Sequence, residues 1–150
     1  MSASPLHVLV PVRGDAPFLA AALQSLRAQT FADWHAALCP LDANARDIAM
    51  RAIDGDPRMQ VADTVDIPEA KALAHAADAD ASEFLCALDG DDTLEPTAFA
   101  TLIDALIAQP TSGMAYSRHV LIDANGRALG PGPLCELPYS ADALLLDFMT

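Results

Sequence analysis

Short apolar runs alternate along the chain with segments in which apolar residues recur every three or four positions. Continuous apolar runs are typical of strands buried in a parallel sheet, and the longer period is typical of helices that pack on it. The runs predict strands at 6–12, 34–39, 58–62, 84–88 and 114–122, with a turn and a hairpin strand at 127–129. The periodic segments predict helices at 16–28, 45–53, 67–79 and 96–109, and a last helix capped by Ser140.

This order of elements predicts an α/β fold. Strands that alternate with helices are joined by right-handed crossovers, so the sheet is mostly parallel and helices cover both faces. The result is a Rossmann-like three-layer sandwich. The chain has 150 residues, 53% of them hydrophobic, without internal repeats or a low-complexity linker, which indicates a single domain with a sizeable core.

One predicted strand ends in an acidic turn. The apolar run 84–88 is followed by Asp89, Gly90, Asp91 and Asp92. Ligands of open α/β sheets bind beyond the carboxyl ends of the strands, and alternation of side chains lets Asp89 and Asp91 point the same way. Two carboxylates there suit Mg²⁺ or Mn²⁺ that also contacts substrate phosphates. The alternative is an acidic turn that only closes the strand.

Charge narrows the classes of partner. The formal net charge is −13, with eight Lys and Arg, so nucleic-acid binding is disfavoured and an anionic ligand would need a metal bridge.

No apolar stretch is long enough to span a bilayer, and the first residues do not form a signal peptide. We therefore expect a cytoplasmic protein without a transmembrane segment.

Cysteines and histidines suggest no metal set. The three cysteines are far apart and form no CxxC pair, so we expect small buried hydrophobes rather than disulfides or a zinc site. The histidines at 7, 35, 75 and 119 are scattered, and we interpret them as structural or surface residues.

Known glycine-rich phosphate loops are absent. The first strand is followed by Arg13-Gly14-Asp15, which is neither GxGxxG nor a Walker sequence. A bound nucleotide would then depend on a metal at the acidic turn. Asp42, just beyond the second strand, could accept hydrogen bonds from the base, or it could cap the helix that follows.

Several segments match one family in the correct order. They are Val8–Val12 with Pro11, Phe18 to Thr30 with its Ser25-Leu26 and Gln29-Thr30 ending, 31–34, Leu85–Asp92, Pro96, Tyr116-Ser117 and Ile122–Gly126. In these segments the chain resembles the family 2 glycosyltransferases, whose catalytic domain has the GT-A fold.

The resemblance implies transfer of a sugar from a nucleotide sugar, usually UDP- or GDP-linked, to a polysaccharide, lipid or protein-glycan acceptor. Asp89 would contact ribose or metal, Asp91 would bind the metal at the diphosphate, and Asp42 would bind the base. Asp92 would orient the loop or the sugar. The Mn²⁺ or Mg²⁺ cofactor would act as a Lewis acid. The implied nucleotide-sugar-binding residues are Pro11, Arg13, Asp42, Lys71, Asp89 and Gly90, with Asp89 and Asp91 as metal ligands.

The chain also departs from the family pattern. Arg13-Gly14 stands where the family usually has Tyr-Asn, one aspartate of its Asp-Asp-Gly-Ser is lost at Leu41-Asp42, and Lys71 stands where it has Arg. Arg13 and Lys71 could attract a diphosphate, or could be ordinary surface charges.

The family's catalytic base lies in its acceptor-binding half. No candidate for it follows 144–150, so we expect a GT-A domain cut before that half, with no catalytic residue and no transfer activity of its own. The full enzyme would be inverting. The exposed apolar residues of the last helix, Leu144, Leu145 and Phe148, could support a homodimer.

Two other functions are weighed. One is a degenerate, non-catalytic glycosyltransferase-like domain for assembly or regulation. The other is a nucleotidyltransferase, which would normally show a glycine-rich loop with basic residues after the first strand. A calcium-binding EF-hand loop is disfavoured because Leu94 and Ala100 occupy the positions that need Gly and Glu.

Overall fold

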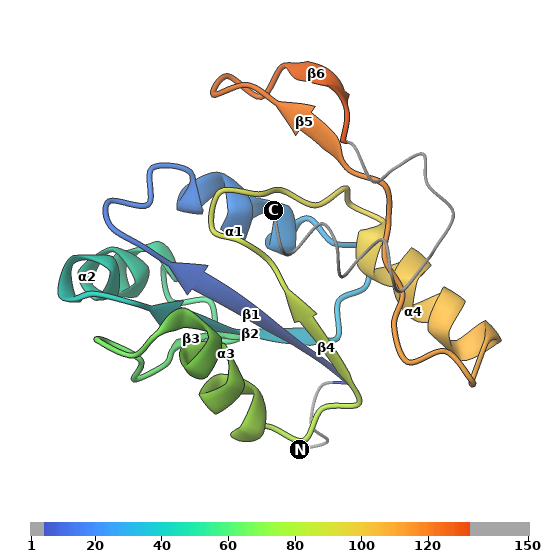
Figure 1. Cartoon of the computed structure of the whole chain (residues 1–150), viewed down its shortest axis with the longest axis horizontal. Coiled ribbons are helices and arrows are strands. Elements are labelled where there is room, and N and C mark those ends of the chain that lie inside the picture. The colour runs from blue at the N-terminus through green and yellow to red at the C-terminus, as the bar shows by residue number, and fades with distance from the viewer. Residues whose placement is uncertain (1–4, 133–150) are drawn as a thin grey trace.

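A four-stranded parallel sheet forms the centre of the computed structural model, which describes residues 5–132 (Figure 1). Its strands are β1 (Leu6–Val12), β2 (Trp34–Pro40), β3 (Met59–Val61) and β4 (Phe84–Ala87). They lie in the order β3-β2-β1-β4, with Leu6 in register with both Trp34 and Phe84. The predicted parallel sheet is therefore confirmed.

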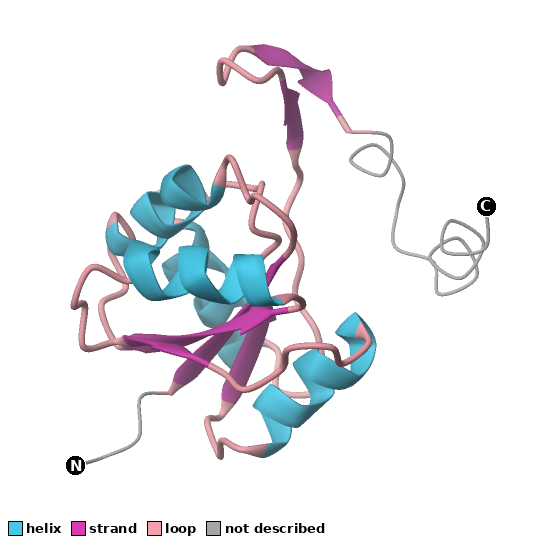
Figure 2. Cartoon of the chain, turned by 90° about the vertical axis from the view of Figure 1, so that its left-hand side faces the viewer, coloured by secondary structure: helices cyan, strands magenta, loops and turns pink. Residues whose placement is uncertain are grey.

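Helices cover both faces of this sheet (Figure 2). They are α1 (Leu19–Arg27), α2 (Ala43–Ala52), α3 (Glu69–Asp78) and α4 (Ala98–Ala108). Because side chains alternate along a strand, Val8 and Val10 pack with α1, α2 and α4 on one face, whereas Leu9 packs with α3 on the other. The predicted α/β sandwich, with helices on both faces of a parallel sheet, is confirmed.

The first helix begins later than the spacing predicts. Residues 13–18 form two successive turns, with backbone N–H bonds from Ala16 to the Arg13 carbonyl and from Leu19 to the Ala16 carbonyl. Helix α1 then begins after Phe18, and no side chain caps it. These turns separate Asp15 from the helix start, so the helix predicted at 16–28 begins only at Leu19.

Strand β4 is less buried than its apolar sequence predicts. The prediction of a fully buried strand is wrong, since Leu85 is 58% exposed and only Leu88, just after the strand, is buried. The strand order explains this, because β4 is the edge of the described sheet and pairs only with β1. On the face where Leu85 lies, α3 covers β1 and β2 instead.

The last described elements are β5 (Val120–Ile122) and β6 (Ala128–Pro131), an antiparallel hairpin that stands apart from the main sheet in Figure 1. The predicted turn is confirmed: Asp123 Oδ1 accepts the backbone N–H groups of Asn125 and Arg127 at 2.9 Å each. Of the predicted strand 114–122, only the last three residues form a strand, and the Gly132 N–H adds one bond to the carbonyl of His119 just before it.

Two predictions concern residues that are not described. The helix capped by Ser140, and the homodimer through Leu144, Leu145 and Phe148, lie outside residues 5–132. Within that range, none of the helices has the length and apolar character needed to cross a membrane.

Candidate functional site

A pocket of about 180 Å³ opens at the carboxyl ends of β1 and β4. The loop after β1 forms one wall and the acidic turn after β4 forms the other. The lining residues are Pro11, Val12, Arg13, Ala16, Pro17, Phe18, Asp89, Gly90 and Asp91. Pockets that hold a whole drug-sized ligand measure roughly 300–1,000 Å³. This pocket is therefore large enough for one part of a nucleotide sugar, such as its diphosphate, and not for the complete molecule.

The pocket lies where the chain changes direction across the sheet. From β1 the chain continues to β2 and β3 on one side, and it returns to β4 on the other side of β1. The connections through α1 and α3 cover opposite faces, so the loops diverge between β1 and β4. Open α/β sheets bind their ligands at such a switch point.

Gly90 allows the two walls to approach closely. A Cβ atom at this position would lie 3.0 Å from the carbonyl oxygen of Pro11. The turn is also tied to β1 by the N–H of Leu88, which donates to the carbonyl of Leu9 at 2.9 Å. A side chain at residue 90 would push the acidic turn away from the loop after β1.

The three carboxylates of the acidic turn are exposed. Asp89 and Asp91 line the pocket, as the alternation of side chains predicts. The pKa of Asp92 is raised by partial desolvation and by the negative charges of Asp91 and Asp89. A cation placed among these groups would relieve that repulsion.

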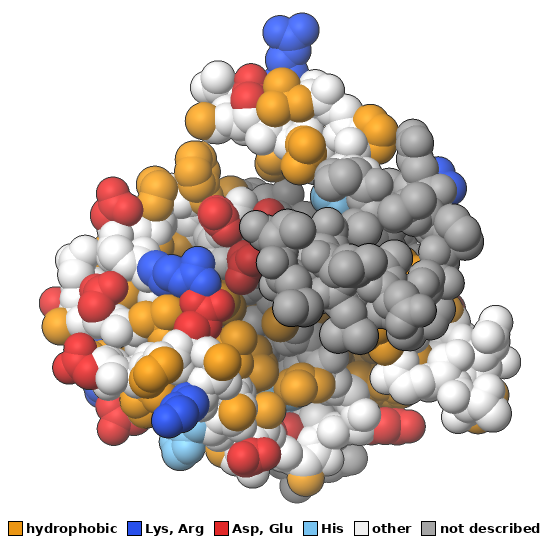
Figure 3. Space-filling model, viewed as in Figure 1, with side chains coloured by type: hydrophobic (Ala, Val, Ile, Leu, Met, Phe, Trp, Pro, Cys, Tyr) orange, Lys and Arg blue, Asp and Glu red, His pale blue; other side chains and the backbone are white. Residues whose placement is uncertain are grey.

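Arg13 provides the positive charge of the pocket. Its guanidinium donates to the carboxylate of Glu69, at the first residue of α3. The pKa of Arg13 is raised mainly by Glu69, with smaller contributions from Asp89 and Asp91. These three carboxylates give Arg13 negative surroundings. Acidic side chains (red) are also spread over the face of the molecule shown in Figure 3.

Lys71 lies apart from the pocket lining. It is exposed in the first turn of α3, and within residues 5–132 its ammonium group makes no ion pair. The structure therefore brings Pro11, Arg13, Asp89, Gly90 and Asp91 together, and leaves Lys71 outside.

Asp42 is the N-cap of α2. Its Oδ1 accepts the N–H of Ala45 at 2.8 Å, and its Oδ2 accepts the N–H of Gly14 at 2.9 Å. These two bonds lower the pKa of the Asp42 carboxyl. Asn44 adds a bond to the Gly14 carbonyl at 2.9 Å. Of the two roles predicted for Asp42, helix capping is observed, and base binding stays a prediction.

Gly14 needs this support because of its backbone. Its φ is +55°, a conformation that favours glycine. By holding Gly14, Asp42 and Asn44 fix the loop that carries Arg13 beside the pocket. Asp42 thus acts on the candidate site through the loop after β1.

The segment after the acidic turn is held by the end of α1. Gln29 is 7% exposed; its Nε2 donates to the Glu95 carbonyl at 2.8 Å, and its Oε1 accepts the Phe99 N–H at 3.1 Å. Ser25 Oγ accepts the N–H of Leu94 at 3.1 Å. Sequence reasoning noted these residues only as part of a family pattern and missed this positioning role.

The residues at this site fit Mg²⁺ or Mn²⁺ only together with a phosphate ligand. Asp89 and Asp91 supply two carboxylates, and such ions commonly use one or two carboxylates plus substrate phosphates. Within residues 5–132, one group of three side chains lies close enough to share an ion. It consists of His7, His35 and Asp80, at the amino ends of the strands, on the opposite side of the sheet from the pocket. The prediction that the histidines belong to no metal set overlooked this group.

No model of a known protein family matches this chain, and no curated protein matches it. The fold and the pocket define the chain as a Rossmann-like α/β domain with two carboxylates at the switch point of its sheet.

Proposed function

We propose that this domain binds the diphosphate of a nucleotide sugar through a divalent cation held by Asp89 and Asp91. The observation that carries the proposal is the pocket between β1 and β4, where two carboxylates and Arg13 meet at the switch point of the sheet. The ordered resemblance to family 2 glycosyltransferases supports the same class of ligand. The GT-A fold is part of this proposal.

The negative charge of the pocket explains why a cation is needed. A diphosphate that approached Asp89 and Asp91 directly would be repelled, and Arg13 is already paired with Glu69. A Mg²⁺ or Mn²⁺ ion between the carboxylates and the diphosphate would turn this repulsion into attraction, and it would supply Lewis-acid stabilisation of the leaving diphosphate.

The protein's own residues would position the ligand. Gly90 keeps the acidic turn close to Pro11, and Gln29 fixes the segment that follows the turn. Arg13 would exchange part of its contact with Glu69 for a phosphate oxygen. Asp42 holds the loop after β1 and would contact the base only through an oxygen that also bonds a backbone N–H.

The activity served by this binding would be glycosyl transfer to an acceptor such as a polysaccharide, lipid or protein glycan. A UDP- or GDP-linked donor, a cytoplasmic location and a homodimer are further predictions of the resemblance and of the sequence. None of the described residues is assigned as the catalytic base.

Calorimetry with UDP, GDP, CDP and dTDP tests the proposal. Each nucleotide is titrated into the protein with Mn²⁺ and again with EDTA in place of the metal. We expect saturable 1:1 binding of at least one nucleotide in Mn²⁺ only. If none of the four binds while circular dichroism shows a folded protein, the proposal is wrong.

A further inference from the structure

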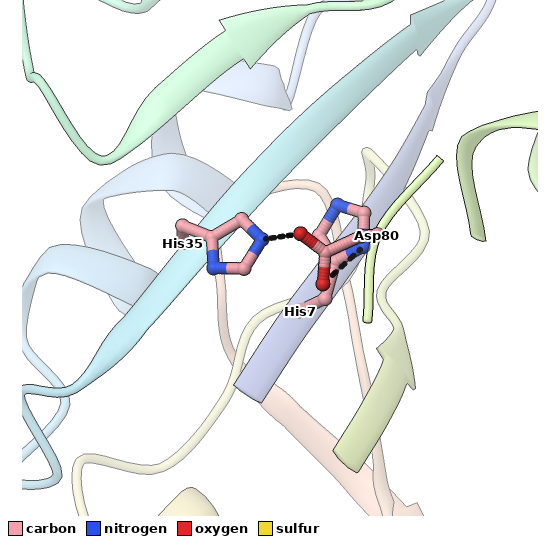
Figure 4. A group of neighbouring side chains, drawn as sticks. All are labelled: His7, His35 and Asp80. Atoms are coloured by element: carbon pink, nitrogen blue, oxygen red, sulfur yellow. Dashed lines mark hydrogen bonds and ion pairs between the residues drawn. The ribbon is translucent and has the colours of Figure 1, made fainter. Parts of the chain in front are cut away.

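Two histidines and an aspartate converge near the amino ends of the strands, at the end of the sheet away from the pocket (Figure 4). His7 is the second residue of β1 and His35 the second residue of β2, and the two are in register. Asp80 follows α3 and precedes β4. All three lie at the amino ends of the strands, so they are separate from the acidic turn.

Both imidazole rings direct a nitrogen towards the same carboxylate. The rings are stacked, with centroids 4.5 Å apart and planes inclined by 17°. His35 Nε2 lies 3.0 Å from Asp80 Oδ2, and His7 Nδ1 lies 3.8 Å from Asp80 Oδ1. One ligand atom from each residue can be chosen so that all three lie within 4.8 Å of one another.

His7 is the member of the group that protein contacts leave unsatisfied. It is 2% exposed, and neither of its ring nitrogens has a hydrogen-bond partner among residues 5–132. The distance of 3.8 Å to Asp80 is too long for a hydrogen bond. Buried polar groups without a partner are rare in folded proteins and often indicate a missing ion or water.

We infer that His7, His35 and Asp80 form a binding site for a divalent transition-metal ion of the zinc type. Two imidazoles and one carboxylate are a donor set that zinc uses, with bonds of about 2.0–2.2 Å. Ligand atoms around one zinc ion then lie about 3.3 Å apart. Because a metal ion lies in the plane of each imidazole that binds it, the partly exposed His35 ring would have to turn out of its stack on His7, with a smaller rotation of Asp80, to reach that spacing.

The surroundings of the three side chains suit this role. The N–H of Ser82 donates to Asp80 Oδ1 at 2.8 Å and so orients the carboxylate. The side chains of His35 and Asp80 are 23% and 26% exposed, which gives an ion access and leaves room for water ligands.

The bound ion would join three segments of the fold. It would tie β1, β2 and the chain entering β4 together at the amino ends of the strands. We therefore assign the site a stabilising role. The inference does not depend on the proposed nucleotide site, which lies at the carboxyl ends.

The full chain, freed of affinity tag and treated with EDTA, is titrated with Zn²⁺ by calorimetry, and its thermal unfolding is followed with and without Zn²⁺. We expect 1:1 binding and a higher unfolding midpoint with the metal. His35→Ala and Asp80→Asn should each weaken binding at least tenfold. His75→Ala changes an exposed histidine of α3 and should bind Zn²⁺ as the unaltered protein does.

Circular dichroism checks that each variant is folded, and His35→Gln replaces His35→Ala if the alanine variant is not. Absorption spectra with Co²⁺ in place of Zn²⁺ report whether nitrogen ligands hold the ion. The inference is overturned if Zn²⁺ does not bind saturably, or if the folded His35 and Asp80 variants bind it as tightly as the His75→Ala control.

Discussion

Gly90 packs directly against Pro11: a Cβ atom at residue 90 would lie only 3.0 Å from the Pro11 carbonyl oxygen. Gly90→Ala should therefore displace the acidic turn and destabilise the protein by roughly 1–2 kcal/mol, because the new Cβ would press on a backbone carbonyl of the buried strand β1, which cannot move aside as a flexible side chain can. Urea unfolding measures the change.

Gly113→Ala is the matched control for this substitution. A Cβ at Gly113 meets no atom within 4 Å, and its backbone does not need glycine. Its effect should stay within about 0.5 kcal/mol. Equal effects of the two substitutions would show that the contact with Pro11 does not restrict residue 90.

Gln29 should contribute strongly to stability for a polar side chain. Gln29→Ala leaves the Glu95 carbonyl and the buried Phe99 N–H without their partner, so we expect a loss of about 2–3 kcal/mol in the free energy of unfolding. Chemical denaturation measures it. Gln109→Ala, at an exposed position, should be nearly neutral. A similarly small loss for Gln29→Ala would contradict the role of Gln29 in holding the segment after the acidic turn.

The two roles of Asp42 can be separated by two substitutions. Asp42→Ala removes the acceptors of both the Ala45 and the Gly14 N–H groups and should lower the unfolding midpoint, whereas Asp42→Asn keeps one oxygen to cap α2, loses the bond to the Gly14 N–H and should have a smaller effect. Thermal unfolding measures both. If Asp42 also binds the base, Asp42→Asn should change the order of affinity among nucleotides; an unchanged order would leave capping as its role.

Asp56 makes the stability depend on pH in the acid range. Arg58 is the main cause that lowers its pKa to about 2, and Arg27 contributes. Because the folded pKa lies below the ordinary value of 3.8, the carboxylate stabilises the fold above pH 4, and this stabilisation is lost as the pH falls towards 2.

Asp56→Asn should therefore destabilise the protein by roughly 1–2 kcal/mol at pH 7, with the side chain only 12% exposed. The difference between the two proteins should shrink between pH 4 and pH 2 in urea unfolding. A difference that stays constant over this range would show that the ion pairs with Arg58 and Arg27 are not its cause.

Local pattern was sufficient for most strands and helices and for the acidic turn. Apart from His7, the run 6–12 is apolar on both faces, and the structure buries all seven residues of β1. The same reasoning failed for β4, because its position at the edge follows from the order β3-β2-β1-β4, which no local pattern encodes. The switch point itself also depends on that order.

Contacts between distant segments were the main features that sequence could not predict. Gln29 and Phe99 are 70 positions apart and meet only because α4 packs beside α1 on the sheet. His7 and His35 meet through the register of β1 and β2, and Asp80 joins them from the end of α3. An alignment of the two strands on their apolar residues would have paired the two histidines, but it would not have placed Asp80.

The pocket was predictable in part: its residues follow from local pattern, but their contacts do not. Asp89 and Asp91 could be predicted because strand alternation puts them on one side, and Arg13 because it follows the neighbouring strand. The ion pair of Arg13 with Glu69 depends on the placement of α3 and was not predicted. It shows that Arg13 is already engaged before any ligand binds.

The most direct test of the metal-dependent site compares Asp91→Asn with Asp104→Asn, a substitution of an exposed aspartate on α4. Each protein is titrated by calorimetry, in Mn²⁺, with the nucleoside diphosphate that the unaltered chain binds. We predict that Asp91→Asn keeps its fold and loses at least tenfold in affinity, while Asp104→Asn binds normally. Equal affinity of the two variants, or equal binding by the unaltered chain in Mn²⁺ and in EDTA, would contradict a metal-bridged nucleotide at the acidic turn.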